Sequence, residues 1–286
     1  MRFCLFWWFC TLTALCSPVG AQSSITVTAQ LPVFLYQGDQ PKLQFLLSNN
    51  SATEQTGNLQ LELFDAIKKQ PVDGWFYNQL ANQYFTLGPG ERYQVRFPVN
   101  IPHTFSGSFD WQLTLRIDST QQQLRGQLKV INANQYEDTE PENEKKMKGG
   151  IVLIGVNQQS SKPASETNIT PFSTQPVGQP VLVRFTIVIH EKMDSCRVLL
   201  PVSAGLQPTG NGVQLKKAKP RSIVYHPKSD TAISMTLYGL ALGVYQWDYP
   251  FIARYPGEFL VPSCRLLLFN TTRRDYRTGT SSILID

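Results

Sequence analysis

The side chains that carry most enzyme chemistry are scarce in this sequence. It has only three histidines, and charged residues make up 16% of its 286 residues, below the usual share of about a quarter. No G-x-S-x-G elbow, P-loop, C-x-x-C pair or dinucleotide glycine fingerprint occurs. His190-Glu191 opens like a zinc-protease motif, but Asp194 stands where the second histidine belongs. The sequence therefore predicts no catalytic residue, no metal site and no cofactor, and favours a protein that is not an enzyme.

An excess of charge of one sign is also missing. The net charge is +5, and one of its contributors, Arg2, lies in a segment that we expect to be removed. The basic run at 216–221 has no aromatic residues beside it on which bases could stack. A weak and dispersed positive charge argues against binding to nucleic acid.

The first 21 residues have the pattern of a signal peptide. Arg2 precedes an apolar run from Phe3 to Cys16, which is shorter than the roughly 20 residues that span a membrane. Val19-Gly20-Ala21 then offers the small residues of a cleavage site, so we expect cleavage after Ala21. Lipid attachment at Cys16 and an uncleaved anchor are the alternatives. The mature chain is expected in the periplasm or secreted, with no transmembrane segment.

Few cysteines remain after such a cleavage. Of the five in the sequence, only Cys196 and Cys264 lie beyond the signal peptide. An even pair in an oxidising compartment predicts a disulfide bond between them. The alternative is two buried thiols on neighbouring strands.

Apolar and polar residues alternate along most of the sequence. This alternation predicts short strands separated by turns about every ten residues, with no helical stretch. We therefore expect an all-β protein with two immunoglobulin-like or macroglobulin-type β-sandwiches, residues 22–132 and 151–286. Between them, residues 133–150 are charged and almost free of apolar side chains, which predicts a flexible linker.

The most regular stretch lies near the C-terminal end, at residues 244–269. Apolar and aromatic side chains alternate from Tyr245 to Ala253, and a second apolar run ends at Phe269. Pro256-Gly257 lies between the two runs and favours a tight turn. This pattern predicts a long antiparallel hairpin that a second sheet must cover.

Three consecutive aromatic residues, Trp75, Phe76 and Tyr77, fall in the least periodic part of the first region, residues 66–82. Aromatic side chains exposed in such a segment would form a ligand surface. The alternative is a local plug over one end of the sandwich.

Several motifs resemble those of the bacterial α2-macroglobulin family. LPVFLYQGD (31–39) and FTLGPGERYQVRFPV (85–99) are similar to a macroglobulin-type domain that precedes the family's thioester domain. VLLPVSAGLQP (198–208) and the stretch from Gly243 to Asn270 are similar to its C-terminal receptor-binding-like domain. The resemblance covers both predicted sandwiches. It implies a role in envelope defence against proteases.

The sequence departs from the family where covalent chemistry would occur. It contains no Cys-x-Glu-Gln thioester motif, and a charged linker stands where the thioester domain would lie. Covalent trapping of proteases is therefore not implied.

This pattern leaves three functions to compare. The first is an exported, non-enzymatic interaction module, and the resemblance implies a protease, a macroglobulin or a peptidoglycan synthase as partner. The second is an immunoglobulin-like adhesin or glycan-binding module that uses the aromatic residues. The third, a hydrolase, would need a nucleophile and base assembled around His103, His190 or His226, and the sequence gives it little support.

Overall fold

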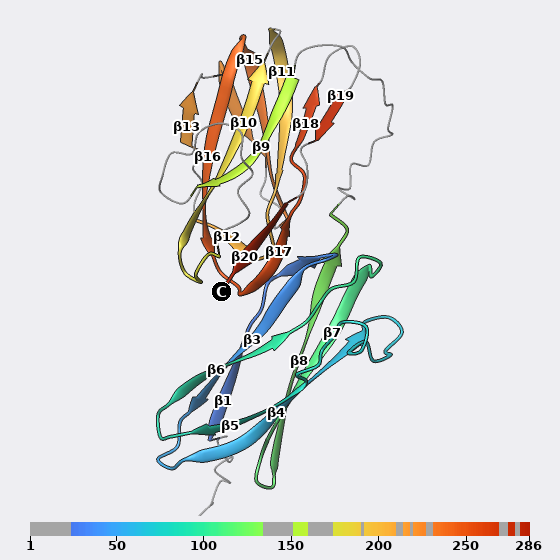
Figure 1. Cartoon of the computed structure of the whole chain (residues 1–286), viewed down its shortest axis with the longest axis vertical. Helices are drawn as coiled ribbons and strands as arrows, with labels where there is room; N and C mark the ends of the chain where they lie inside the picture. Colours follow the sequence, from blue (N-terminus) through green and yellow to red (C-terminus); the bar gives the residue numbers. More distant parts are fainter. Residues whose placement is uncertain are drawn as a thin grey trace, which may run out of the picture.

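The computed structural model describes residues 24–133, 151–159, 174–189, 192–209, 214–217, 220–226, 231–268, 274–277 and 281–286. These residues form twenty strands, and no helix occurs among them. In the described part of the chain, no helix is therefore long and apolar enough to cross a membrane. Figure 1 shows two layered β-structures that lie end to end along the long axis of the molecule. The predicted all-β sandwich class is confirmed. The predicted signal peptide and nearly all of the predicted linker lie outside the described residues.

The first sandwich contains eight strands in two sheets. One sheet has the order β2-β8-β7-β4-β5, and the other places β3 between β1 and β6. Alternate side chains of β4, such as Leu59, Leu61 and Leu63, point into the core and are fully buried, as the period of two requires. The strands are β1 (Ile25–Gln30), β2 (Phe34–Tyr36), β3 (Gln40–Asn49), β4 (Gln55–Asp65), β5 (Asn82–Leu87), β6 (Arg92–Pro98), β7 (Gly107–Ile117) and β8 (Thr120–Ile131).

The second sandwich also has two main sheets. One has the order β12-β16-β10-β9 with β13 beside β16, and the other has the order β14-β15-β11-β18-β19. The aromatic side chains Tyr245, Trp247, Tyr249 and Phe251 of β16 are all buried between them. The strands are β9 (Ile151–Gln159), β10 (Pro180–Ile189), β11 (Met193–Pro201), β12 (Leu206–Pro208), β13 (Gln214–Lys217), β14 (Ser222–Tyr225), β15 (Ala232–Leu240), β16 (Gly243–Ala253), β18 (Arg265–Leu268) and β19 (Arg274–Arg277).

The long hairpin predicted at residues 244–269 is wrong. The first run is β16, which pairs with β10, β12 and β13, whereas the second run divides into β17 (Gly257–Val261) and β18. Strand β17 pairs with β20 (Ser281–Ile285), and β18 pairs with β11 and β19 in the opposite sheet. Pro256 and Gly257 thus turn the chain out of one sheet instead of closing a hairpin.

The junction between the sandwiches is a continuous β-sheet. Strand β17 pairs with the start of β3 at Glu258–Gln40 and Gly257–Pro41, so the sheet of β1, β3 and β6 continues into β17 and β20. Gly257 has φ 136°, and a Cβ atom there would lie 2.6 Å from the carbonyl oxygen of Gln40. Only glycine allows this close backbone approach. Figure 1 places the C-terminus beside this junction, and Lys42 Nζ lies 2.8 Å from Asp286 Oδ1 there.

The predicted Cys196–Cys264 disulfide is not formed in the structure, where both residues are buried thiols. Cys196 lies opposite Leu268 in the β11–β18 ladder, and Arg265 lies opposite Leu199. Continuing this register by one residue places Cys264 opposite Leu200, four residues along β11 from Cys196. At about 3.3 Å per residue the offset along the strands alone is about 13 Å, whereas a disulfide requires the two Cα atoms to lie about 4.4–6.8 Å apart.

Candidate functional site

The segment between β4 and β5, residues 66–81, is the candidate site, and we call it the aromatic loop. Four of its large apolar side chains are more than a third exposed. Trp75 is 48% exposed and Tyr77 63%, and the other two are Ile67 and Leu80. The sequence predicted both an irregular segment here and a ligand surface on Trp75, Phe76 and Tyr77. The structure brings two of these three side chains to the surface.

Phe76 is fully buried and therefore cannot line a ligand surface. Its ring packs edge-to-face against Phe105 and Phe109, with ring centroids 5.0 and 5.1 Å apart. Trp75 packs edge-on against the other side of this cluster, 5.6 Å from Phe105. Such aromatic pairs stabilise by about 0.5–1.5 kcal/mol each beyond the burial of their area. Phe76 therefore plugs the sandwich, while Trp75 and Tyr77 face solvent. A ligand surface on these two exposed rings stays a prediction.

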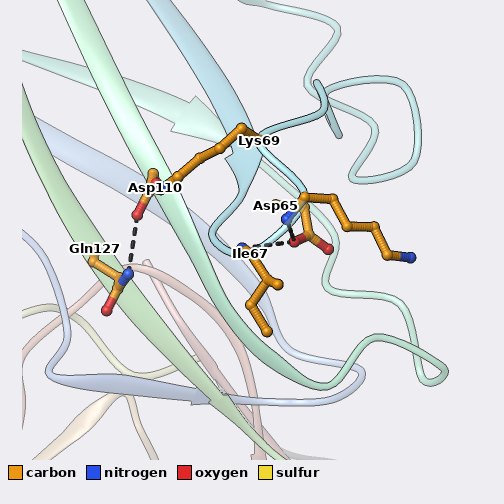
Figure 2. Close-up of polar contacts among 6 residues, drawn as sticks. Asp65, Ile67, Lys69, Asp110 and Gln127 are labelled. Carbon is orange, nitrogen blue, oxygen red and sulfur yellow. Dashed lines mark hydrogen bonds and ion pairs between the residues drawn. The ribbon is translucent and has the colours of Figure 1, made fainter.

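Two aspartates, Asp65 and Asp110, hold the start of the aromatic loop (Figure 2). The Asp65 Oδ1 atom accepts hydrogen bonds from the backbone N–H groups of Ile67 at 2.8 Å and Lys68 at 2.7 Å. These two bonds lower the pKa of Asp65 because they stabilise the ionised carboxylate. The resulting turn reverses the chain at the end of β4.

Lys69 ties the same turn to neighbouring strands of the sheet that contains β4. Its ammonium lies 2.6 Å from Asp110 Oδ2 on β7, and Gln127 on β8 donates to Asp110 Oδ1 at 3.0 Å. The bond from Lys69 is the largest cause of the lowered pKa of Asp110. Lys69 also has φ 57°, a left-handed backbone conformation that a residue other than glycine seldom adopts.

The centre of the aromatic loop is held by Asp73 and Asn78. The Asp73 carboxylate accepts the backbone N–H of Leu63 at 3.1 Å and the side-chain amide of Asn78 at 2.8 Å. The buried Asn78 amide also donates to the Leu61 carbonyl at 3.0 Å. Between these two anchors, Tyr77 has φ 53°, so the chain is bent at the residue that presents its ring. A loop this constrained offers its aromatic rings at little cost in entropy.

The other residues that sequence reasoning considered do not converge on a site. His103 is exposed beside Gly38, His226 bonds through Nε2 to Thr236 Oγ1 at 2.7 Å, and His190 lies outside the described residues. Within the described ranges, no three histidine, cysteine or acidic side chains gather as they would around a metal ion.

A cavity in the core of the second sandwich is too small for a ligand. Its volume is about 20 Å³, which holds about one water molecule. It is mainly apolar and is lined by Leu200, Trp247 and Cys264 among others. Ser203 also lines it, and the Ser203 hydroxyl has no hydrogen-bond partner among the described residues.

Comparison with known proteins relates most of the second sandwich to one family. Residues 154–267 match the family model of the bacterial alpha-2-macroglobulin MG10 domain. The chain resembles the bacterial α2-macroglobulins. This confirms the resemblance that the motifs indicated, although the matched model is MG10 and the motifs were compared with the receptor-binding-like domain.

The fold of this chain is similar to that of two solved structures of bacterial α2-macroglobulins. Native alpha-2-macroglobulin from Escherichia coli, spanning domain MG7 to the C-terminus, aligns with a TM-score of 0.61 over 91% of this chain and 99% of that one, at 8% identity. A mutant of Salmonella alpha-2-macroglobulin aligns with a TM-score of 0.59, also at 8% identity, over 92% of this chain and 41% of that one. No curated protein matches the sequence.

One residue that sequence reasoning did not single out is Asp39. It is the last residue of the LPVFLYQGD motif, whose pattern indicates the family resemblance but not a role for this aspartate. In the structure its carboxyl group is fully buried and lies at the junction of the two sandwiches.

Proposed function

We propose that this chain is an exported, non-enzymatic protein-interaction module, accessory to envelope defence against proteases. Its resemblance to the bacterial α2-macroglobulins supports the pathway. The aromatic loop supports the mode of action, and the observation that carries the proposal is the exposure of Trp75 and Tyr77 on a backbone fixed from both sides. Tryptophan and tyrosine are among the residues that dominate binding energy in protein interfaces.

The proposed binding mode is non-covalent. The sequence has no Cys-x-Glu-Gln motif that could form a thioester. Cys196 is buried, and burial raises its pKa to about 12, so its thiol is protonated and unreactive near neutral pH. The affinity for a partner therefore comes from non-covalent contacts with the side chains of the aromatic loop.

The proposed partner is a protein of the cell envelope, namely a protease, a full-length macroglobulin or a peptidoglycan synthase. A protein partner suits this surface better than a glycan does, because the exposed Ile67 and Leu80 offer apolar contact beside the two aromatic rings. Sugars stack on flat rings and gain less from aliphatic side chains.

The test compares capture by the wild-type chain from Gln22 with capture by a Trp75→Ala/Tyr77→Ala variant, using a crosslinked envelope extract. Tyr93→Ala is a matched control, because Tyr93 is 48% exposed like Trp75 but lies on β6 in the other sheet. We expect one protein to be recovered by the wild type and the control and to be lost with the double variant. Equal recovery with all three chains would contradict the proposed site. Binding of the wild type to purified peptidoglycan, lost in the double variant, would support the glycan-binding alternative instead.

A further inference from the structure

The junction between the sandwiches contains a buried acidic group that the proposed function does not use. Asp39 precedes β3 and is fully buried. Its Oδ2 atom accepts the backbone N–H of Tyr36 at 2.7 Å, within the first sandwich. Its Oδ1 atom accepts the backbone N–H of Leu260 at 2.7 Å, across the junction. One carboxyl group therefore bonds to both sandwiches.

Other contacts surround this group and exclude water from it. The Tyr36 hydroxyl reaches across the junction to the carbonyl oxygens of Val202 at 3.2 Å and Thr231 at 3.4 Å. The Lys42 backbone N–H donates to the Pro256 carbonyl at 2.9 Å. Since these bonds join the same two bodies, separation of the sandwiches would break all of them and expose Asp39 to solvent.

Burial raises the pKa of Asp39 from 3.8 to about 7, and the two backbone N–H bonds only partly oppose it. Burial removes the ionised carboxylate from water, and the hydrogen bonds from two neutral N–H donors only partly offset this loss of solvation free energy. Five other titratable or charged side chains lie around the junction, and none of them is a cause of this shift. They are Tyr36 on β2, Lys42 on β3, His103 over Gly38, Glu258 on β17 and Asp286 at the C-terminus.

We propose that Asp39 is a proton-controlled latch between the two sandwiches, which holds them together when its carboxyl group is neutral and loosens when that group ionises. With the proton on Oδ2, the neutral carboxyl still accepts the Leu260 N–H at its carbonyl oxygen Oδ1 and has no charge to solvate. When the junction opens, the carboxyl regains water and its ordinary pKa. The closed junction thus binds the proton more tightly. By linkage its stabilisation is complete below about pH 4 and is lost as the pH rises through about 7.

The size of the effect follows from the same two values. With a pKa of 3.8 in the open state and about 7 in the closed state, the equilibrium constant for closing falls by roughly 100-fold between pH 5 and pH 8. A difference this large is measurable even when the closed junction predominates at both pH values.

The first experiment is an NMR titration of the wild-type chain labelled with ¹⁵N-leucine and ¹⁵N-lysine. The Leu260 amide donates to Asp39, so we expect its chemical shift to change with a midpoint near pH 7. The Lys68 amide donates to Asp65 in the same way, but the pKa of Asp65 is lowered, so its midpoint should lie below 3.8. A Leu260 midpoint near 4 in the closed protein would overturn the latch. His103→Gln removes the nearest imidazole and should leave the Leu260 midpoint unchanged.

The second experiment tests the opening itself by hydrogen exchange of the Leu260 amide and by small-angle scattering at pH 5 and pH 8. We expect wild-type protection at Leu260, corrected for the intrinsic rate, to fall by roughly 100-fold at pH 8, with a larger radius of gyration. Asp39→Asn should remove this pH dependence. Glu258→Gln, which neutralises an exposed carboxylate of the same junction, should retain it. Equal pH dependence in wild type and Asp39→Asn would refute the proposal, and the wild-type titration remains decisive if the variant does not fold.

Discussion

Phe76 and Trp75 are adjacent in the sequence but should differ sharply in what they contribute to stability. Phe76→Ala removes a fully buried ring from contact with Phe105 and Phe109. Truncation of a buried phenylalanine costs about 3–5 kcal/mol, because the ring's burial is lost and a cavity remains. Trp75→Ala removes a ring that is 48% exposed, packs edge-on against Phe105 and is tilted against Phe76. We therefore expect a loss of about 1–2 kcal/mol.

The assay is urea unfolding of the full mature chain, followed by circular dichroism so that loss of a tryptophan does not alter the signal. For Phe76→Ala we expect the midpoint to fall substantially at an unchanged m-value. Tyr77→Ala serves as the control, because Tyr77 is 63% exposed and should change stability little. If Trp75→Ala is as destabilising as Phe76→Ala, then Trp75 belongs to the plug and cannot be assigned to a binding surface.

Two further predictions concern the junction and the cysteines. Gly257→Ala should destabilise the junction by more than about 1 kcal/mol, because a Cβ atom would meet the Gln40 carbonyl, and the thermal midpoint should fall accordingly. Since Cys196 and Cys264 are buried thiols, a reducing agent should leave the thermal midpoint unchanged. Alkylation under denaturing conditions without reductant should then modify both cysteines, whereas modification of neither would establish a disulfide.

Alternation of side chains was enough to predict most strands, because a period of two identifies a strand with one buried face wherever it lies. It could not predict which neighbour each strand pairs with. The runs at β16 and β17 are adjacent in sequence and separated by Pro256-Gly257, which favoured a hairpin. Strand β16 actually pairs with β10, and β17 pairs with β20 and with β3 of the first sandwich. None of these partners is the adjacent run, and no local pattern specifies such pairings. The predicted disulfide is absent from the structure for the same reason, because the register between strands decides whether two cysteines meet.

The position of the candidate site could be predicted from the sequence, but the orientation of its side chains could not. The absence of periodicity at residues 66–82 correctly indicated an irregular segment with aromatic residues. Which of three consecutive aromatic side chains faces inward depends on the backbone, and φ 53° at Tyr77 could not be inferred from residue types. Asp39 was visible only as part of a motif, because burial at a junction depends on contacts with Leu260, 221 residues away.

The most direct test of the proposed interaction module is site-specific photo-crosslinking. A benzophenone amino acid replaces Tyr77 in the aromatic loop of the full chain, and Tyr93 in a matched second chain. We expect position 77 to crosslink to a single envelope protein in cells, and position 93 to give no such product. Crosslinking to the same protein from both positions, or from neither, would contradict the assignment of the aromatic loop as the binding surface.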